Sequence, residues 1–427
     1  MKIELIHQFF LECQSIAIDT RKINADCMFV ALKGENFDAN TFAKEALNKG
    51  AKYVIIDNHE YYIDPRTLLV KNALETLQEL AKFHRNFLKT PIVALTGSNG
   101  KTTTKELINV VLSKKYRTTA TIGNLNNHIG VPLTLLSFTE KTKIGIVEMG
   151  ANHQKEIEFL CDLAQPDFGY ITNFGKAHLE GFGGVEGVIK GKSEMYDYLR
   201  NNRKSAFVNN NDAIQIEKSK GIDKFTFGIN DEKNQLNITS ISANPFVKIQ
   251  FNNVEIKSNL IGLYNANNIM AAILIGQHFE INDAQIKEAI ENYIPENNRS
   301  QLINKNSNEI ILDAYNANPS SMKAALENFI QLDKPKKIII IGDMFELGNE
   351  SFLEHKSIVE MMLDQDDIEC VFVGNDFYAN KLSQENFKFY KDFDDLSEYL
   401  KQKSTKNTSI LIKGSRGMAL ERVLDFI

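Results

Sequence analysis

The stretch Thr96-Gly97-Ser98-Asn99-Gly100-Lys101-Thr102-Thr103 decides the fold of this chain, because a short apolar run precedes it and a helical pattern follows it. Residues 92–95 are typical of a buried parallel strand, and residues 104–113 carry apolar side chains on one helical face. A strand, a glycine-rich turn, a Lys-Thr pair and a helix are the layout of a phosphate-binding loop. Backbone N–H groups of such a turn and the positive end of the helix attract anions.

The residue types in this loop assign roles to two side chains. Lys101 can reach the terminal phosphates of a nucleotide, and the Thr102 hydroxyl can bind Mg²⁺. Only two residues separate Gly97 from Gly100, which is fewer than in the common pattern, so an ordinary Gly/Asn turn is the alternative interpretation. The flanking strand and helix favour the phosphate-binding interpretation.

Composition excludes several classes of protein. The 427 residues predict roughly two to four domains. A net charge of −6 gives no general attraction to nucleic acid or to an anionic membrane surface. The four cysteines are scattered, which favours a reducing cytosol over a disulfide framework. The N-terminal residues lack a signal-peptide pattern, and no apolar run approaches the ~18 residues of a membrane span. We therefore expect a cytoplasmic protein with no nucleic-acid partner and no membrane span.

The order of strands and helices predicts an α/β fold in three domains, covering residues 1–88, 89–297 and 298–427. In the first domain, a turn followed by a strand is predicted over 25–34, and a strand at 53–56. Strands are predicted at 92–95, 144–148, 168–173, 207–209 and 225–227 in the second domain, and at 310–313, 337–341, 371–373 and 410–412 in the third. Helices are predicted at 42–48, 74–88, 104–113, 185–199 and 263–275, and loose alternation over 231–259 predicts antiparallel β structure. Regular alternation in the third domain predicts a parallel, Rossmann-like sheet.

Polar residues follow several of the predicted strands, where parallel sheets carry their ligand sites. Glu148 ends one strand and can hold Mg²⁺, although a surface glutamate fits the same position. His178 follows another strand and can bind a metal, although a single histidine is more often structural. Residues 123–132 are rich in Asn and Gly, which suits sugar hydroxyls or a plain loop. By charge alone, Lys192 lies on a solvated helix face and residues 19–21 form a solvated turn.

In the third domain, polar clusters follow three strands, at residues 313–319, 342–346 and 413–417. A cleft between this domain and the phosphate loop would suit an enzyme that closes over ATP.

Taken together, these motifs resemble the Mur ligases of peptidoglycan synthesis. The resemblance rests on Thr-Gly-Ser-Asn-Gly-Lys-Thr at 96–102, Glu-Met-Gly-Ala-Asn-His at 148–153, Ala-His-Leu-Glu-Gly-Phe-Gly at 177–183 and the Asn-rich segment 123–132. The stretches 148–153, 313–319, 342–348 and 413–418 resemble the branch of this family that adds a dipeptide. The resemblance runs from Asp19 to the C-terminus, so it covers nearly the whole chain.

The resemblance implies a small N-terminal α/β domain that binds the UDP-muramoyl substrate, a central P-loop ATPase-type domain with a parallel sheet, and a C-terminal Rossmann-like domain for the incoming amine. It implies ATP-dependent amide formation through an acyl phosphate, with UDP-N-acetylmuramoyl-tripeptide and D-Ala-D-Ala as substrates and ATP and Mg²⁺ as cofactors. We expect the enzyme to act as a monomer.

Functional residues carry over from the family by position. The ATP site would comprise Gly97, Ser98, Asn99, Gly100, Lys101, Thr102, Thr103, Asn265, Asn268, Arg299 and Asp313. Magnesium would bind Thr102, Glu148, His178 and Lys192, where Lys192 matches the lysine that is carbamylated by CO₂ in this family. Catalysis would fall to Lys101, Lys192 and His178. Substrates would contact Asp19, Thr20, Arg21, Asn126, Asn127, Asn316, Asn318, Lys413, Ser415 and Arg416.

Three motifs depart from the family pattern. Ser193 follows Lys192 where glycine is usual, and Tyr264 stands where the family has histidine before the first adenine-side asparagine. The family's Asp-Gly-His is Asp38-Ala39-Asn40 here, which removes any contact that depends on that histidine.

Three alternatives stay open at this point. The first is the neighbouring ligase that adds the third amino acid, which usually carries a different segment at 313–319. The second is folylpolyglutamate synthetase, which shares the fold but lacks the C-terminal motifs. The third is a catalytically inactive nucleotide-binding regulator, which the complete set of predicted site residues argues against.

Overall fold

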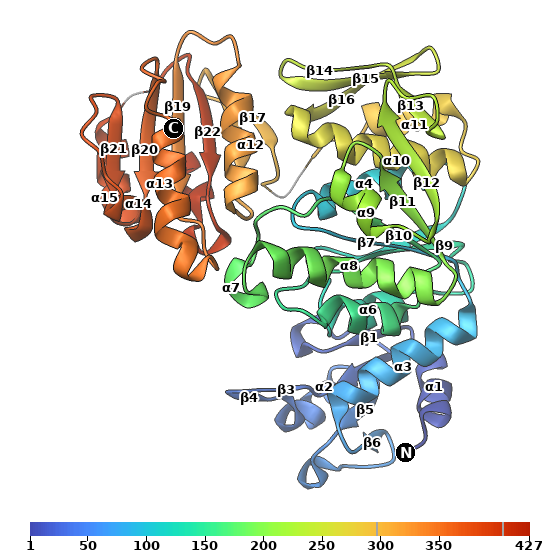
Figure 1. Cartoon of the computed structure of the whole chain (residues 1–427). Helices are drawn as coiled ribbons and strands as arrows, with labels where there is room; N and C mark the ends of the chain where they lie inside the picture. The colour runs from blue at the N-terminus through green and yellow to red at the C-terminus, as the bar shows by residue number, and fades with distance from the viewer. Residues whose placement is uncertain (296–297, 404) are drawn as a thin grey trace.

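The computed structural model describes residues 1–295, 298–403 and 405–427, and it has three α/β domains (Figure 1). The N-terminal domain, in blue, lies below the central domain, and the C-terminal domain, in orange and red, lies beside the central domain's upper part. Residue 297, the predicted end of the central domain, lies outside the described residues. Within the described residues, no helix is both long and apolar enough to cross a bilayer.

The N-terminal domain is built on a four-stranded sheet in the order β1-β2-β5-β6, in which every neighbouring pair is parallel. Its elements are α1 (Ile3–Leu11), β1 (Ser15–Ala17), β2 (Cys27–Val30), β3 (Lys33–Gly34), β4 (Phe37–Asp38), α2 (Ala43–Asn48), β5 (Ala51–Ile56), β6 (Thr67–Leu69) and α3 (Ala73–Leu88). The strands and helices predicted here are confirmed within a few residues.

Helix α3 joins the first domain to the second. Asn72 caps its start by accepting hydrogen bonds from the backbone N–H groups of Leu74 and Glu75. At its other end, the Arg85 guanidinium donates to the Ala164 carbonyl at 2.9 Å in the central domain. The helix therefore packs against both domains.

The central domain contains a seven-stranded sheet in the order β13-β12-β11-β10-β7-β9-β8, again parallel throughout. Its elements are β7 (Ile92–Thr96), α4 (Lys101–Leu112), β8 (Thr118–Ala120), α5 (Gly130–Leu136), β9 (Ile144–Glu148), α6 (Glu156–Ala164), β10 (Phe168–Ile171), α7 (Leu179–Phe182), α8 (Val185–Asn201), β11 (Ser205–Asn209), α9 (Ala213–Lys218), β12 (Asp223–Ile229), β13 (Leu236–Ile238), β14 (Ser240–Ala243), β15 (Phe246–Phe251), β16 (Val254–Ile261), α10 (Ala266–His278) and α11 (Asp283–Glu291). Strand β7 lies between β9 and β10, so three strand ends converge at the phosphate loop.

Two predictions for this domain were partly wrong. Residues 240–261 form the predicted antiparallel strands, but β13 pairs in parallel with β12 at the edge of the main sheet. The Asn- and Gly-rich composition of segment 123–132 predicts a loop, yet α5 begins at Gly130. The Asn127 side chain accepts from the N–H groups of Ile129 and Gly130, which satisfies donors at the start of that helix.

The C-terminal domain has a six-stranded sheet in the order β17-β18-β22-β19-β20-β21. Its elements are β17 (Gln301–Lys305), β18 (Asn308–Asp313), α12 (Pro319–Ile330), β19 (Lys337–Gly342), α13 (Ser351–Met361), β20 (Ile368–Val373), α14 (Asn375–Ala379), β21 (Phe387–Tyr390), α15 (Phe393–Gln402) and β22 (Ser409–Lys413). The four predicted strands are confirmed. The sheet is mixed rather than parallel, because β17 forms a hairpin with β18 and pairs with it antiparallel.

Candidate active site

The phosphate loop runs from the end of β7 to the start of α4, as predicted. Gly97 and Gly100 have φ angles of +140° and +78°, which are accessible to glycine and strained for other residues. A Cβ atom at Gly97 would also collide with Thr172, so the loop lies against the segment that follows β10. Both glycines are therefore required by the local geometry.

Thr172 and Asn173, which directly follow β10, hold Asn99 at the tip of this loop. The Asn99 carbonyl accepts hydrogen bonds from Thr172 Oγ1 at 2.6 Å and from Asn173 Nδ2 at 3.0 Å. The Asn99 backbone N–H donates to Asn173 Oδ1 at 3.1 Å. The short loop thus takes its shape from a neighbouring strand end as well as from its own residues.

Lys101 folds back over the loop. Its Nζ donates to the carbonyls of Gly97 at 2.7 Å and Ser98 at 3.3 Å. Burial lowers the pKa of Lys101 from its ordinary value, while the nearby Glu148 carboxylate opposes that shift. An amine at this position is suited to meet a phosphate oxygen that enters the loop.

Glu148 lies at the end of β9 and is 1% exposed, so the alternative of a surface glutamate is wrong. Its Oε1 accepts from Asn126 Nδ2 at 2.8 Å and from Thr102 Oγ1 at 3.3 Å. Its Oε2 is buried and has no hydrogen-bond partner among the described residues. A buried carboxylate oxygen that lacks a partner, beside a threonine hydroxyl, is a donor set that fits Mg²⁺.

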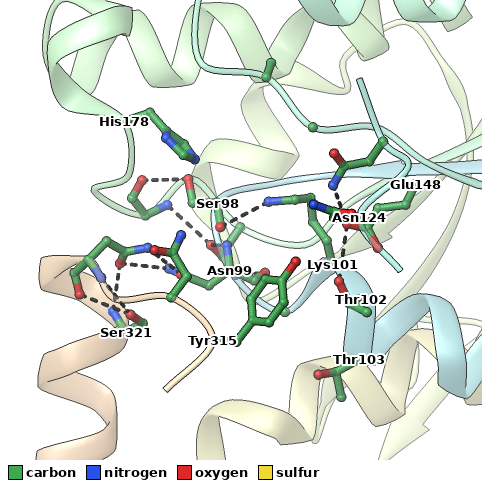
Figure 2. Close-up of a pocket in the computed structure, with 18 of the residues that line it drawn as sticks. Ser98, Asn99, Lys101, Thr102, Thr103, Asn124, Glu148, His178, Tyr315 and Ser321 are labelled. Carbon is green, nitrogen blue, oxygen red and sulfur yellow. Dashed lines mark hydrogen bonds between the residues drawn. The ribbon is translucent and has the colours of Figure 1, made fainter. Parts of the chain in front are cut away.

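His178 immediately precedes α7 and lies on the other side of the loop from Glu148 (Figure 2). Its Nδ1 contacts the carboxylate of Glu346, which belongs to the C-terminal domain. This contact lowers the pKa of Glu346. In this arrangement His178 joins two domains, and its ring lines the same cavity as the phosphate loop.

Lys192 is completely buried, so its interpretation as part of a solvated helix face was wrong. Its Nζ donates to the Ala151 carbonyl at 3.1 Å and lies 5.0 Å from the centroid of the Phe182 ring. Burial lowers the pKa of Lys192 well below its ordinary value, and the positive charge of Lys101 adds to the shift. Burial therefore disfavours the charged form of this amine relative to an exposed lysine.

Asn265 and Asn268 lie at the wall of the cavity and are each 4% exposed. Asn268 Nδ2 donates to Asn265 Oδ1 at 2.8 Å, and Thr104 Oγ1 donates to Asn268 Oδ1 at 3.0 Å. A Cβ atom at Gly100 would collide with the Asn268 amide. These asparagines therefore support the phosphate loop from behind.

Where the central and C-terminal domains meet, Arg299 stacks on Tyr315 with 3.8 Å between the guanidinium carbon and the ring centroid. Asp313 accepts from the Ser300 N–H at 3.1 Å and pairs with Lys413 Nζ at 2.5 Å. Lys413 is 1% exposed and the Asp313 side chain is 17% exposed, so this ion pair is partly buried. The predicted Arg299, Asp313 and Lys413 thus come together.

One cavity of about 990 Å³ extends from the phosphate loop to the C-terminal domain. The predicted site residues that line it are Ser98, Asn99, Gly100, Lys101, Thr102, Thr103, Asn126, Asn127, Glu148, His178, Asn265, Asn268, Arg299, Asp313, Asn316, Asn318 and Lys413. Sequence reasoning did not assign Asn124, His128, Gln154, Tyr315 or Ser321, which also line it. In the sequence, these residues are marked only by their position within or close to the segments 123–132, 148–153 and 313–319.

Other predicted residues lie away from this cavity. Asp19 and Arg21 form a bidentate ion pair beside Thr20, and the Arg21 side chain is 86% exposed, as the solvated-turn interpretation expects. In the C-terminal domain, Ser415 accepts from the Phe345 N–H at 2.9 Å, and Arg416 pairs with Glu421. The structure does not bring these two groups together with the phosphate loop.

Asn40, which replaces the family's histidine, is completely buried. Its amide donates to Asp38 at 2.7 Å and to Asp57 at 2.9 Å, and it accepts from the Asp57 N–H at 3.0 Å. Its hydrogen bonds are thus used within the N-terminal domain.

Three successive parts of the chain match known protein families. Residues 12–85 match the family described as "Mur ligase family, catalytic domain". Residues 95–276 match "Mur ligase middle domain", and residues 298–416 match "Mur ligase, glutamate ligase domain". The chain is 33% identical over 426 residues to UDP-N-acetylmuramoyl-tripeptide–D-alanyl-D-alanine ligase of Bacillus subtilis, covering 96% of this chain and 92% of that one.

Solved structures agree with the sequence comparison. MurF from Acinetobacter baumannii superimposes with a TM-score of 0.87 at 28% identity, covering 99% of this chain and 98% of that one. MurF ligase from Thermotoga maritima, in complex with ADP, superimposes with a TM-score of 0.84 at 25% identity, covering 98% and 97%.

Proposed function

Because the chain belongs to the Mur ligase family, we propose that it joins D-Ala-D-Ala to UDP-N-acetylmuramoyl-tripeptide with cleavage of ATP. The product is the pentapeptide precursor of peptidoglycan, which a cell needs for its shape and division. The Bacillus subtilis relative, which this chain matches over 92% of that protein's length, is named for this reaction.

The observation that carries this proposal is the cavity shared by two domains. Its central-domain wall holds the phosphate loop and Glu148, and its C-terminal wall holds Asn316 and Lys413. A reaction between a phosphorylated carboxylate and an amine needs both partners held close together in one space. A cavity of about 990 Å³ between domains provides such a space.

In the first step, an oxygen of the tripeptide's terminal carboxylate attacks the γ-phosphorus of ATP. The bond from that phosphorus to the bridging oxygen breaks, and ADP leaves with its electron pair. Lys101 offsets the repulsion between the two anions, and the N–H groups at the start of α4 face the phosphates. Phosphorylation turns a carboxylate, whose leaving group would be oxide, into an acyl phosphate with a good leaving group.

In the second step, the amine nitrogen of D-Ala-D-Ala attacks the acyl carbon. The bond from carbon to the phosphate oxygen breaks, inorganic phosphate leaves with the electron pair, and the nitrogen loses a proton to solvent. We assign Asn316, Asn318, Lys413, Ser415 and Arg416 to the side on which this dipeptide enters. The cavity lining supports the first three of these assignments.

Magnesium supplies charge neutralisation for the phosphates when it is bound. We propose that Thr102 and Glu148 hold one ion. The buried Glu148 Oε2, which has no hydrogen-bond partner in the described part of the chain, supports this assignment. We assign His178 and Lys192 to a second ion, with Lys192 carbamylated. The complete burial of Lys192 supports this, because an amine without charge can attack CO₂ and lose a proton.

We also propose domain boundaries at 1–88, 89–297 and 298–427. We further propose that the protein is a monomer and that it works in the cytoplasm.

The first domain would bind the UDP-muramoyl group, with Asp19, Thr20 and Arg21 at the UDP end and Asn126 and Asn127 toward the sugar. The wide exposure of the Arg21 side chain supports its access to a ligand.

Phosphate release by the purified protein tests the proposal. The assay supplies ATP and Mg²⁺, and adds UDP-N-acetylmuramoyl-tripeptide and D-Ala-D-Ala separately and together. We expect release only with both substrates, and a product whose mass equals that of the pentapeptide.

Two other outcomes would contradict the proposal. Release with a single amino acid in place of the dipeptide would indicate the neighbouring ligase that adds the third residue. Nucleotide binding without release under any combination would indicate an inactive regulator.

A further inference from the structure

The phosphate loop contacts the C-terminal domain directly through two asparagine side chains. Asn318 Nδ2 donates to Asn99 Oδ1 at 2.7 Å, and Asn99 Nδ2 lies 3.4 Å from Asn318 Oδ1. These residues are 219 positions apart in the chain. Figure 2 shows Asn99 beside the turn that carries Ser321, at the start of a C-terminal helix. A residue of the ATP site thus reaches the domain assigned to the amine.

On the central-domain side, Asn99 cannot move independently of its loop. Its carbonyl and its N–H are held by Thr172 and Asn173, as described above. A change in the loop's position on binding phosphates would therefore displace the Asn99 side chain as well.

On the C-terminal side, Asn318 is equally fixed. It caps α12, because its Oδ1 accepts from the Ser321 N–H at 2.9 Å and its own N–H donates to Ser321 Oγ at 3.1 Å. Asn318 is 6% exposed. Two residues earlier, the Asn316 carbonyl accepts from Lys413 Nζ at 3.3 Å. A displacement of Asn318 would therefore reach the C-terminal wall of the cavity.

We propose that Asn318 is a positioning residue that couples nucleotide binding at the phosphate loop to binding of the dipeptide substrate. This inference rests on the proposed function for its choice of ligands. The Asn99–Asn318 contact exists only while the central and C-terminal domains are packed together. A nucleotide that binds more tightly to this packed arrangement therefore also stabilises the C-terminal wall of the cavity in the position where the dipeptide binds. Coupling of this kind is reciprocal, so each ligand tightens the binding of the other by the same factor.

Another contact of the same interface provides a matched control. Lys176, in the loop after β10, pairs with Glu354 of α13 at 2.5 Å, and its side chain is 46% exposed. Glu354→Gln weakens the interface between the same two domains without touching the phosphate loop. It therefore separates a general loosening of the interface from loss of the asparagine pair.

The experiment measures the affinity for D-Ala-D-Ala by calorimetry on the full chain, with UDP-N-acetylmuramoyl-tripeptide and Mg²⁺ present. Each variant is measured with and without a saturating non-hydrolysable ATP analogue, and the ratio of the two affinities is the coupling factor. The variants are Asn318→Ser, Asn99→Ala, their double mutant and Glu354→Gln. Serine still caps a helix but is too short to reach Asn99.

We expect the analogue to tighten dipeptide binding about tenfold in the wild type. The coupling factor should fall at least about threefold in either asparagine variant, and no further in the double mutant. Glu354→Gln should keep the wild-type factor. Hydrogen exchange on α12 checks that its cap survives in Asn318→Ser, and Asn99→Ala carries the test if the helix frays.

An unchanged coupling factor in Asn318→Ser and Asn99→Ala would overturn this inference, as would a wild-type factor of one. A loss in Glu354→Gln equal to that in Asn318→Ser would assign the coupling to the whole interface and overturn the role of the pair. Wild-type turnover is measured on the same preparation. If that turnover is present, these outcomes reject the inference alone; if it is absent, the proposed function fails as well.

Discussion

At the scale of single residues, the buried charge of Glu148 lowers the stability of the folded state, and the same carboxylate is suited to bind Mg²⁺. One of its buried carboxylate oxygens lacks a partner among the described residues, and a buried charge without full compensation destabilises the folded state. The other oxygen holds Asn126 and Thr102. A neutral amide of the same shape would keep those two contacts and remove the charge.

We therefore predict that Glu148→Gln lowers the rate of ATP-dependent phosphate release by about 100-fold. Without Mg²⁺, the same variant should raise the free energy of unfolding by about 1 kcal/mol, measured by urea denaturation in EDTA. Glu140→Gln, at an exposed position, is the control and should change neither quantity. Equal turnover in Glu148→Gln and wild type would contradict the metal assignment.

A second residue prediction concerns the buried amine of Lys192. Lys192→Met keeps the aliphatic stem beside Phe182 and removes the nitrogen. We expect most activity to be lost, and bicarbonate at high concentration should not restore it because no amine remains to react. Lys190→Met, on the exposed side of the same helix, should retain activity. Full activity in Lys192→Met would remove the carbamate assignment.

Single-residue environments were the least accessible to sequence reasoning. The charge pattern placed Lys192 in solvent, whereas Ala151 and Phe182 from other segments bury it. The Asn99–Asn318 pair spans 219 residues, and no local pattern reports such a contact. The loop that holds Lys101 and Thr102 could be predicted because strand, glycines and helix are adjacent in the chain.

Among the elements, helices α1 and α3 meet through a buried pair of histidines. His7 Nε2 lies 3.0 Å from His84 Nδ1, and His84 Nε2 lies 3.0 Å from the Phe138 carbonyl. Burial lowers the pKa of His7 from 6.5 to about 4, with a smaller contribution from His84. Between these two values the unfolded chain binds more protons than the folded chain.

The stability contributed by neutral His7 is therefore present above pH 6.5 and is lost as the pH falls toward about 4. We predict a loss of about 2 kcal/mol in the free energy of unfolding between pH 7 and pH 4.5 from this residue. Chemical denaturation at several pH values measures it. His7→Phe should flatten the pH dependence, whereas His59→Gln, at an exposed position, should leave it unchanged.

Strong local signals explain which elements could be predicted. The strand at 92–95 and the helix after it have clear apolar patterns, and both are present. The helix begins at Lys101 rather than Thr104, because Gly100 with positive φ allows an earlier turn. Strands β17 and β21 were not predicted, and their pairing depends on β18 and β20 rather than on their own patterns.

At the scale of the whole molecule, α3 serves two domains at once. Leu77, Leu80 and Ala81 are completely buried, and Arg85 donates to carbonyls of the central domain. Each fully buried leucine contributes about 2 kcal/mol relative to an exposed one. A cut after residue 88 would therefore expose apolar surface on the central domain.

We predict that a fragment of residues 73–427, which keeps α3, gives a soluble protein with a cooperative thermal transition. A fragment of residues 89–427 should aggregate or melt at a lower temperature. Soluble yield and differential scanning calorimetry on both fragments measure the difference. Equal yield and equal melting temperature would show that α3 contributes little to the central domain.

The segment after β10 has a consequence for protein engineering. The residues of the phosphate loop look like a portable module, because they form one continuous run of sequence. Asn99, however, is held by Thr172 and Asn173, more than 70 positions away. Grafting the eight-residue run alone onto another parallel sheet would therefore transfer the sequence of the motif but not the contacts that hold its backbone conformation. A working graft would need the neighbouring strand end as a second component.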